Sequence, residues 1–235
     1  GGDETSDEES DDQHVIGYAC CWLAWNSAML GRLKQSISFG ERAHTLSKSF
    51  KSDQYLYFKS LAVIGFVCMN AGDARRATEV GKQILAYGQR HSNIRSMAMG
   101  HICLGINHVI TGDISSAIEC YQQAVQISVE PAYSLYSKTF LGFAYILGGH
   151  IQEAEQTLQE AITEFQEIGY GSVENWARGF FGVVHIMQGR MNEGMNMLKD
   201  ALRIADENET KSLSVILESI LGNVYLQLVA SPEPP

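Results

Sequence analysis

The sequence has 235 residues, of which 45% are hydrophobic, and its formal net charge is −10 at pH 7. Its apolar runs are short and interrupted, so we expect no membrane span, which would need about 20 consecutive apolar residues. The bases form no dense patch of the kind that nucleic-acid binding requires. The five cysteines are odd in number and scattered, which argues against a disulfide framework.

The chain opens with an acidic segment. Seven acids and no base lie between Asp3 and Asp12, without an aliphatic or aromatic residue among them. Such a composition is typical of disorder, so we expect residues 1–12 to be a disordered lead-in. We expect a single helical repeat domain over residues 13–229 and a short tail over residues 230–235. Both ends resemble cut points, and we expect the chain to be a piece of a longer protein.

Apolar residues at spacings of three and four predict paired amphipathic helices along the middle of the chain. A lone helix follows the last pair. The sequence leaves open whether this helix is the native cap of the array or marks the point at which the chain was cut from a longer protein. In chain order, the expected pairs are 13–30 with 33–49, 52–71 with 73–90, 93–111 with 113–128, 131–148 with 150–168, and 171–189 with 191–206, and the lone helix is at about 210–229.

A glycine recurs at one position of this pattern, at intervals of 41, 40, 37 and 40 residues. The five are Gly31, Gly72, Gly112, Gly149 and Gly189. A period near 40 predicts a repeat array. We expect Gly112 to end one helix in the left-handed conformation and Asp113 to cap the next.

A second small residue lies seven positions before each of these glycines. The set is Ala24, Gly65, Gly105, Gly142 and Gly182. We expect these residues, together with Ala117 and its equivalents on the second helices, to lie where the two helices of a pair pass closest. A large side chain there would push the helices apart.

These residues resemble the pattern of the tetratricopeptide repeat (TPR). The third unit carries the resemblance most clearly, through Leu104-Gly105, Ala117, Tyr121 and Ala124. The resemblance covers residues 13–229 and implies an all-α fold: a right-handed superhelix, or α-solenoid, of about five and a half hairpins. The period near 40 departs from the 34 residues of the family, so we expect longer helices or longer loops.

The resemblance also implies that the first helix of each pair lines a concave groove. Carried over position by position, the groove is apolar and partly aromatic, and Lys59 and Asn70 are isolated polar candidates in it. The expected partner-binding residues are Trp25, Phe66, Met69, Ile102, Ile106, Val109, Thr139, Phe143, Ile146 and Val183. The alternative is that these side chains pack on one another inside the array.

We expect a protein-interaction and regulatory module that binds a partner helix or peptide. The alternative is a ligand-sensing TPR domain for a small molecule or a signalling peptide. The sequence holds no catalytic, phosphate-binding or metal-binding motif, so we expect no enzymatic activity, cofactor or metal. We expect no nucleic-acid or membrane partner, and the sequence does not indicate an oligomeric state.

A narrower resemblance rests on Trp22-Leu-Ala-Trp25, Leu30-Gly-Arg-Leu33 and Gly40-Glu-Arg-Ala-His44. These segments are similar to the C-terminal repeats of large bacterial signalling proteins that carry a class III adenylate/guanylate cyclase domain and a signal-transduction ATPase domain. This resemblance implies that any cyclase or ATPase activity resides outside this chain. Together with the cysteine content, it leads us to expect a cytoplasmic location.

Overall fold

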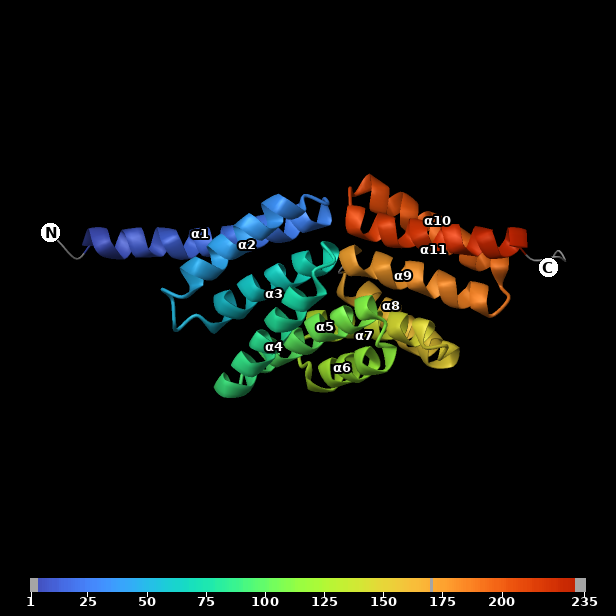
Figure 1. The fold of residues 1–235 in the computed structure, drawn as a ribbon, viewed down its shortest axis with the longest axis horizontal. Coiled ribbons are helices and arrows are strands. Elements are labelled where there is room, and N and C mark those ends of the chain that lie inside the picture. The colour runs from blue at the N-terminus through green and yellow to red at the C-terminus, as the bar shows by residue number, and fades with distance from the viewer. Residues whose placement is uncertain (1–3, 170, 231–235) are drawn as a thin grey trace. The chain divides into compact units, whose positions relative to one another are not determined.

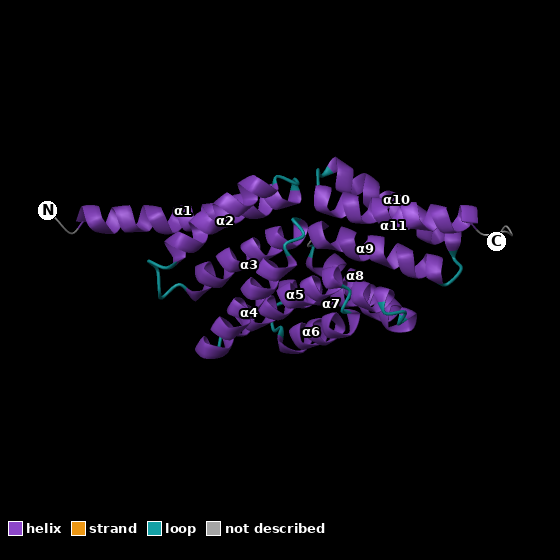
Figure 2. Cartoon of the chain, in the orientation of Figure 1, coloured by secondary structure: helices purple, strands orange, loops and turns teal. Residues whose placement is uncertain are grey.

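The computed structural model describes residues 4–169 and 171–230, which form eleven α-helices and no strand (Figures 1 and 2). The all-α class and the hairpin repeat are confirmed. The helices are α1 (Glu4–Met29), α2 (Leu33–Ser47), α3 (Gln54–Asn70), α4 (Ala74–His91), α5 (Ile94–Thr111), α6 (Ile114–Ile127), α7 (Pro131–Leu147), α8 (Ile151–Ile168), α9 (Gly171–Met187), α10 (Met191–Glu207) and α11 (Lys211–Ala230).

The chain divides into two compact units, Gly1–Tyr133 and Ser134–Pro235. In the first unit, α1 pairs with α2, α3 with α4, and α5 with α6, and each hairpin also contacts the next. The first helices of successive hairpins touch as well, because α1 contacts α3 and α3 contacts α5. In the second unit, α9 packs against α8 and α10, and α11 packs against α10 and α9.

The turns inside the hairpins use glycine as expected. Gly112 has φ +82°, and a Cβ placed on it would meet nothing within 4 Å, so its role lies in the backbone alone. The next residue, Asp113, caps α6 by accepting a hydrogen bond from the Ser116 amide at 3.2 Å. Asp73 caps α4 in the same way, by accepting from the Arg76 amide at 3.0 Å. Each turn therefore ends one helix and starts the next within three residues.

The second set of small residues lies at the helix crossings. A Cβ added to Gly105 of α5 would lie 2.7 Å from the ring of Tyr121 on α6, which is itself buried. A Cβ added to Gly182 of α9 would lie 2.9 Å from the carbonyl oxygen of Gly194 on α10. Neither position has room for a methyl group, so the absence of a side chain sets the distance between the two helices.

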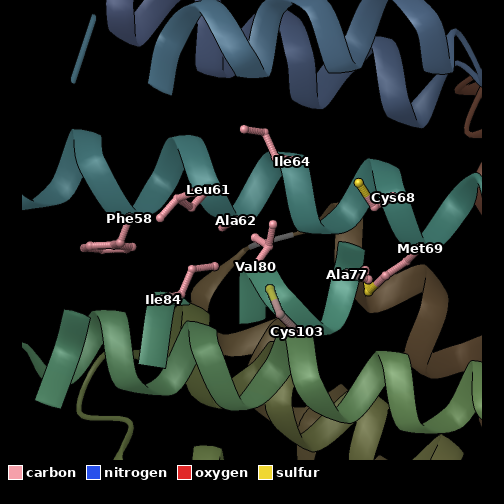
Figure 3. Close-up of a cluster of buried hydrophobic side chains, with 10 residues drawn as sticks. All are labelled: Phe58, Leu61, Ala62, Ile64, Cys68, Met69, Ala77, Val80, Ile84 and Cys103. Carbon is pink, nitrogen blue, oxygen red and sulfur yellow. The ribbon is translucent and has the colours of Figure 1, made fainter. Parts of the chain in front are cut away.

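The core of the first unit lies between α3, α4 and α5 (Figure 3). Most of its side chains come from α3, and α4 contributes Ala77, Val80 and Ile84. The α3 helix is buried on more than one face, because Ile64 also reaches toward α2, where a Cβ on Gly40 would lie 3.0 Å from its Cγ1. This explains why the sequence of α3 is apolar almost throughout.

The helices at the two ends of the array are α1 and α11. Helix α1 begins at Glu4, inside the acidic segment that the sequence predicts to be disordered. Residues 1–3 and 231–235 lie outside the described residues, and the division into a lead-in, a repeat domain and a tail stays a prediction. At the other end, α11 buries Leu213 and Leu217 against its neighbours. None of the described helices is long and apolar enough to cross a membrane.

The Gly105 crossing generates a prediction about packing. Gly105→Ala is expected to lower the free energy of unfolding by about 1–3 kcal/mol, because the added methyl group overlaps the Tyr121 ring. In a Tyr121→Leu background the same substitution should cost clearly less, since the ring is gone. Urea unfolding of the four proteins measures this coupling. Equal costs in the two backgrounds would show that the ring does not set the crossing distance.

Candidate functional site

The first helices of the first unit carry a set of aromatic side chains that share one face. We call these aromatic side chains, together with the lysine among them, the aromatic face. It consists of Tyr18, Trp22 and Trp25 of α1 and of Tyr55, Lys59 and Phe66 of α3. The spacings of four and three residues along α1 place its three members on one side of that helix. The contact between α1 and α3 brings the two rows together.

Ring contacts join the two rows. Trp25 stacks on Phe66 with ring centroids 4.7 Å apart and an angle of 27° between the planes. Tyr18 stacks on Tyr55 at 6.1 Å. Trp25 and Phe66 are both half-buried, so part of each ring remains accessible. Such contacts hold the two helices together and leave an apolar surface facing outward.

Lys59 lies in the middle of the aromatic face. Its ammonium group is 4.0 Å from the centroid of the Trp22 ring and 5.1 Å from that of Tyr55, and it donates a hydrogen bond of 3.1 Å to the Tyr55 hydroxyl. Trp22 is 54% exposed. No ion pair of Lys59 is found among the described side chains. The cation is therefore held by aromatic rings rather than by an acid.

Asp53 anchors the edge of this face. Its carboxylate accepts hydrogen bonds from the Tyr18 hydroxyl at 2.7 Å and from the Leu56 amide at 3.0 Å, and His14 Nε2 lies 2.6 Å away. Burial alone would raise the pKa of the Asp53 carboxyl, but the hydrogen bonds outweigh burial, so the pKa lies below its usual value. Asp53 thus caps α3 and ties α1 to it.

The ten residues predicted to line a groove differ in accessibility. Five are half-buried: Trp25, Phe66, Ile106, Val109 and Phe143. The other five are buried: Met69, Ile102, Thr139, Ile146 and Val183. An incoming partner could reach only the first group without displacing other side chains. The assignment of these residues to partner binding stays a prediction.

Packing explains the buried group. Met69 belongs to the core cluster of α3, α4 and α5, and Thr139 donates its hydroxyl to the Leu135 carbonyl at 2.9 Å. In the second unit, the accessible Phe143 stacks on the buried Phe180 with centroids 4.3 Å apart. These members of the predicted groove lining therefore pack against other side chains of the chain.

Sequence reasoning missed Trp22, Tyr18 and Tyr55. The residues expected to line a groove are Trp25 on α1 and Phe66 and Met69 on α3, and Tyr18, Trp22 and Tyr55 are not among them. The aromatic spacing Tyr18, Trp22, Trp25 is the sequence signal that predicts a shared aromatic side of α1.

The second helices of the first two hairpins, α2 and α4, border a groove that is more polar than the aromatic face. An open groove of about 490 Å³ lies over α3 between α2 and α4, and the ion pair of Glu41 with Arg76, at 2.7 Å, crosses it. Its apolar residues Leu61, Ile64 and Val80 are buried, so the accessible walls are mostly polar. No cluster of three potential metal ligands exists among the described residues.

Several solved structures are similar to this chain. A thermophilic TPR protein of Thermus thermophilus has a TM-score of 0.63 at 20% identity, covering 87% of this chain and 98% of its own. A putative kinesin light chain with TPR-like repeats from Podosopora anserina has a TM-score of 0.54 at 18% identity, covering 81% of this chain and 95% of its own. The apo form of RapI has a TM-score of 0.62 at 15% identity, covering 91% of this chain and 83% of its own.

These similarities establish a TPR-like helical repeat fold. Because the sequence identities are 20% or lower, these similarities show the fold alone. No family model matches the sequence, and no curated protein matches it.

The Asp53 contacts predict a pH dependence. A carboxyl whose pKa is lower in the folded state stabilises the fold above its unfolded pKa, and this contribution is lost as the pH falls through the folded pKa. Asp53→Asn, which keeps an N-cap oxygen, should cost about 1 kcal/mol at pH 7 and flatten the loss of stability below about pH 4. Urea unfolding between pH 7 and 3 measures both effects.

Asp73→Asn is the control for this experiment, because Asp73 is also an N-cap aspartate, at the start of α4. If Asp53→Asn loses stability with falling pH as steeply as the unsubstituted protein, the Asp53 carboxylate does not contribute the proposed contacts.

Proposed function

We propose that the chain is a protein-interaction module and that the aromatic face binds a short segment of another protein. The segment would be a helix or an extended peptide that carries an apolar side chain and a carboxylate close together. The apolar group would cover Trp22 and the Trp25–Phe66 stack, and the carboxylate would pair with Lys59. This proposal selects one part of the groove that the repeat resemblance implies.

The observation that carries the proposal is the exposed Trp22 with the Lys59 ammonium above its ring. Tryptophan and tyrosine are among the residues that contribute most strongly to protein interfaces. An incoming carboxylate could pair with Lys59 without breaking an existing ion pair. The partner would gain a charge contact and apolar burial at the same place.

The proposed acidic character of the partner rests on Lys59 and not on the charge of the whole unit. Residues 13–133 contain eleven Lys and Arg side chains against seven Asp and Glu side chains, but residues 1–12 of the same unit add seven acids and no base. Several acids near the face are already engaged, including Asp53 and Asp73 as helix caps and Glu41 in an ion pair with Arg76.

Further contacts are proposed at the half-buried positions Ile106 and Val109 of α5, and at Phe143 in the second unit. The wider role belongs to the proposal as well: a cytoplasmic, non-enzymatic regulatory module of a larger bacterial signalling protein. It rests on the sequence resemblance to the repeats of cyclase and ATPase proteins.

A peptide-display selection against the 235-residue chain tests the proposed binding. Selected peptides should share an aromatic or aliphatic residue near an acid. Trp22→Ser should weaken their binding by at least about tenfold, because it removes a central aromatic contact. Lys59→Met should weaken binding less in high salt than in low salt, since it removes a screened charge contact. Fluorescence anisotropy with labelled peptides measures both.

Val129→Ser is the matched control, because Val129 is 75% exposed and lies outside the aromatic face. It should leave peptide binding unchanged. Peptides that bind Trp22→Ser and Lys59→Met as tightly as the unsubstituted chain would contradict the proposed site, and so would a selection that enriches no acidic sequences.

A further inference from the structure

A second cation, Arg95, lies beside the aromatic face and is already paired with an acid of the chain itself. Arg95 belongs to the first turn of α5, and its Nε donates to the Oε1 of Glu130, which lies in the connection between α6 and α7. The side chain of Arg95 is 52% exposed and that of Glu130 is 36% exposed. Solvent screens an ion pair of this kind, so it contributes little to stability and can exchange its acid for another one.

Tyr55 lies beside both Arg95 and Lys59. Its hydroxyl accepts the hydrogen bond of 3.1 Å from Lys59. Glu130 raises the pKa of the Arg95 guanidinium most strongly, and Tyr55 is near enough to raise this pKa as well. Tyr55 and Arg95 are one repeat period of 40 residues apart, and α3 packs against α5, which explains why they are close. The aromatic face therefore extends from Lys59 through Tyr55 to Arg95.

The start of α7 is held at the same place. The side chain of Tyr133 hydrogen-bonds with that of Tyr55. Burial, followed by the effects of Tyr55 and Glu130, raises the pKa of the Tyr133 hydroxyl, so this hydroxyl keeps its proton at neutral pH and can donate. Tyr133 follows Glu130 by three residues. This contact therefore keeps the Glu130 carboxylate next to the aromatic face.

The two cations differ in what an incoming carboxylate would meet. Lys59 has no ion pair among the described side chains, so a carboxylate can reach it without competition. A carboxylate that approaches Arg95 has to compete with Glu130. The other acid close to Tyr55 is Asp53, whose carboxylate is engaged in capping α3.

The contact with Glu130 uses only part of the Arg95 guanidinium. Within the described part of the chain, Arg95 donates through Nε, and its terminal nitrogens Nη1 and Nη2 make no hydrogen bond. A guanidinium binds a carboxylate most strongly through two parallel hydrogen bonds. A carboxylate of a partner can therefore offer Arg95 a better contact than Glu130 does.

We infer that Glu130 is an internal competitor of the partner, and that the bound segment carries a second carboxylate, which replaces Glu130 on Arg95. This inference rests on the proposed function and adds one acid to the segment described there. One carboxylate pairs with Lys59 and the other with Arg95, with Tyr55 between them. In the free chain Glu130 neutralises Arg95, and this reduces the attraction of unrelated acidic segments.

Peptides from the display selection test the inference, after each acid of a peptide has been replaced in turn by glutamine. Replacing the acid that reaches Arg95 should weaken binding by about two- to fivefold, which is the range that exposed ion pairs contribute. In Arg95→Met this loss should disappear, because the cation is gone. Glu130→Gln should tighten binding of the two-acid peptide by about twofold or more and leave the peptide without this acid unchanged. Fluorescence anisotropy measures all of these affinities.

The ion pair between Arg75 and Glu79 of α4 supplies matched controls. It is also exposed, with Arg75 Nη1 3.8 Å from Glu79 Oε1, and it belongs to the same unit. Arg75→Met and Glu79→Gln remove the same charges as the test variants. Both should leave the contribution of the second acid unchanged. Circular dichroism should show that all four variants remain folded, because none of the replaced side chains is buried.

The outcomes separate this inference from the proposed function. Peptides that depend on Trp22 and Lys59 but carry one acid, or whose second acid contributes equally with and without Arg95, overturn the inference and leave the proposed function standing. A Glu130→Gln variant that binds the two-acid peptide no more tightly overturns the inference as well, because Glu130 then does not compete. A selection that enriches no acidic peptide overturns the proposed function together with the inference.

Discussion

The distance between paired helices is the constraint on which the rest of this structure depends. It is set where a glycine faces the next helix, as Gly105 faces Tyr121 and Gly182 faces Gly194. Because a methyl group has no room at these crossings, the two helices of a hairpin pack with little space between them. The larger apolar residues on either side can then interlock, which builds the core between α3, α4 and α5.

This close packing also determines what remains outside. Most apolar residues of α3 lie on the sides that pack against α2, α4 and α5. The aromatic face lies on the sides of α1 and α3 that no other helix covers completely. Asp53 fixes the relative position of these two helices through Tyr18 and through the cap of α3. The candidate site is therefore a product of the packing, since its two rows come from helices in different hairpins.

The sequence predicts the hairpins closely because turns and crossings are local features. Gly112 and Asp113 define a turn by their own backbone and side-chain chemistry, and the helix bounds follow within a few residues. The site is harder to predict, because exposure depends on neighbours that are distant in sequence. Met69 and Ile102 share a periodic position with accessible residues but are covered by other hairpins, whereas Trp22 is not. Periodicity predicts to which side of its helix a side chain points, but it does not predict how deeply that side chain is buried.

The helix contacts join elements that are one or two apart along the chain. Forming them requires only short segments to close, so the entropy lost at each step is small, and rapid folding is the physical consequence. It also means that damage to one hairpin spreads mainly to its immediate neighbours. A chain built in this way can gain or lose a hairpin at either end during evolution while the remaining ones keep their cores.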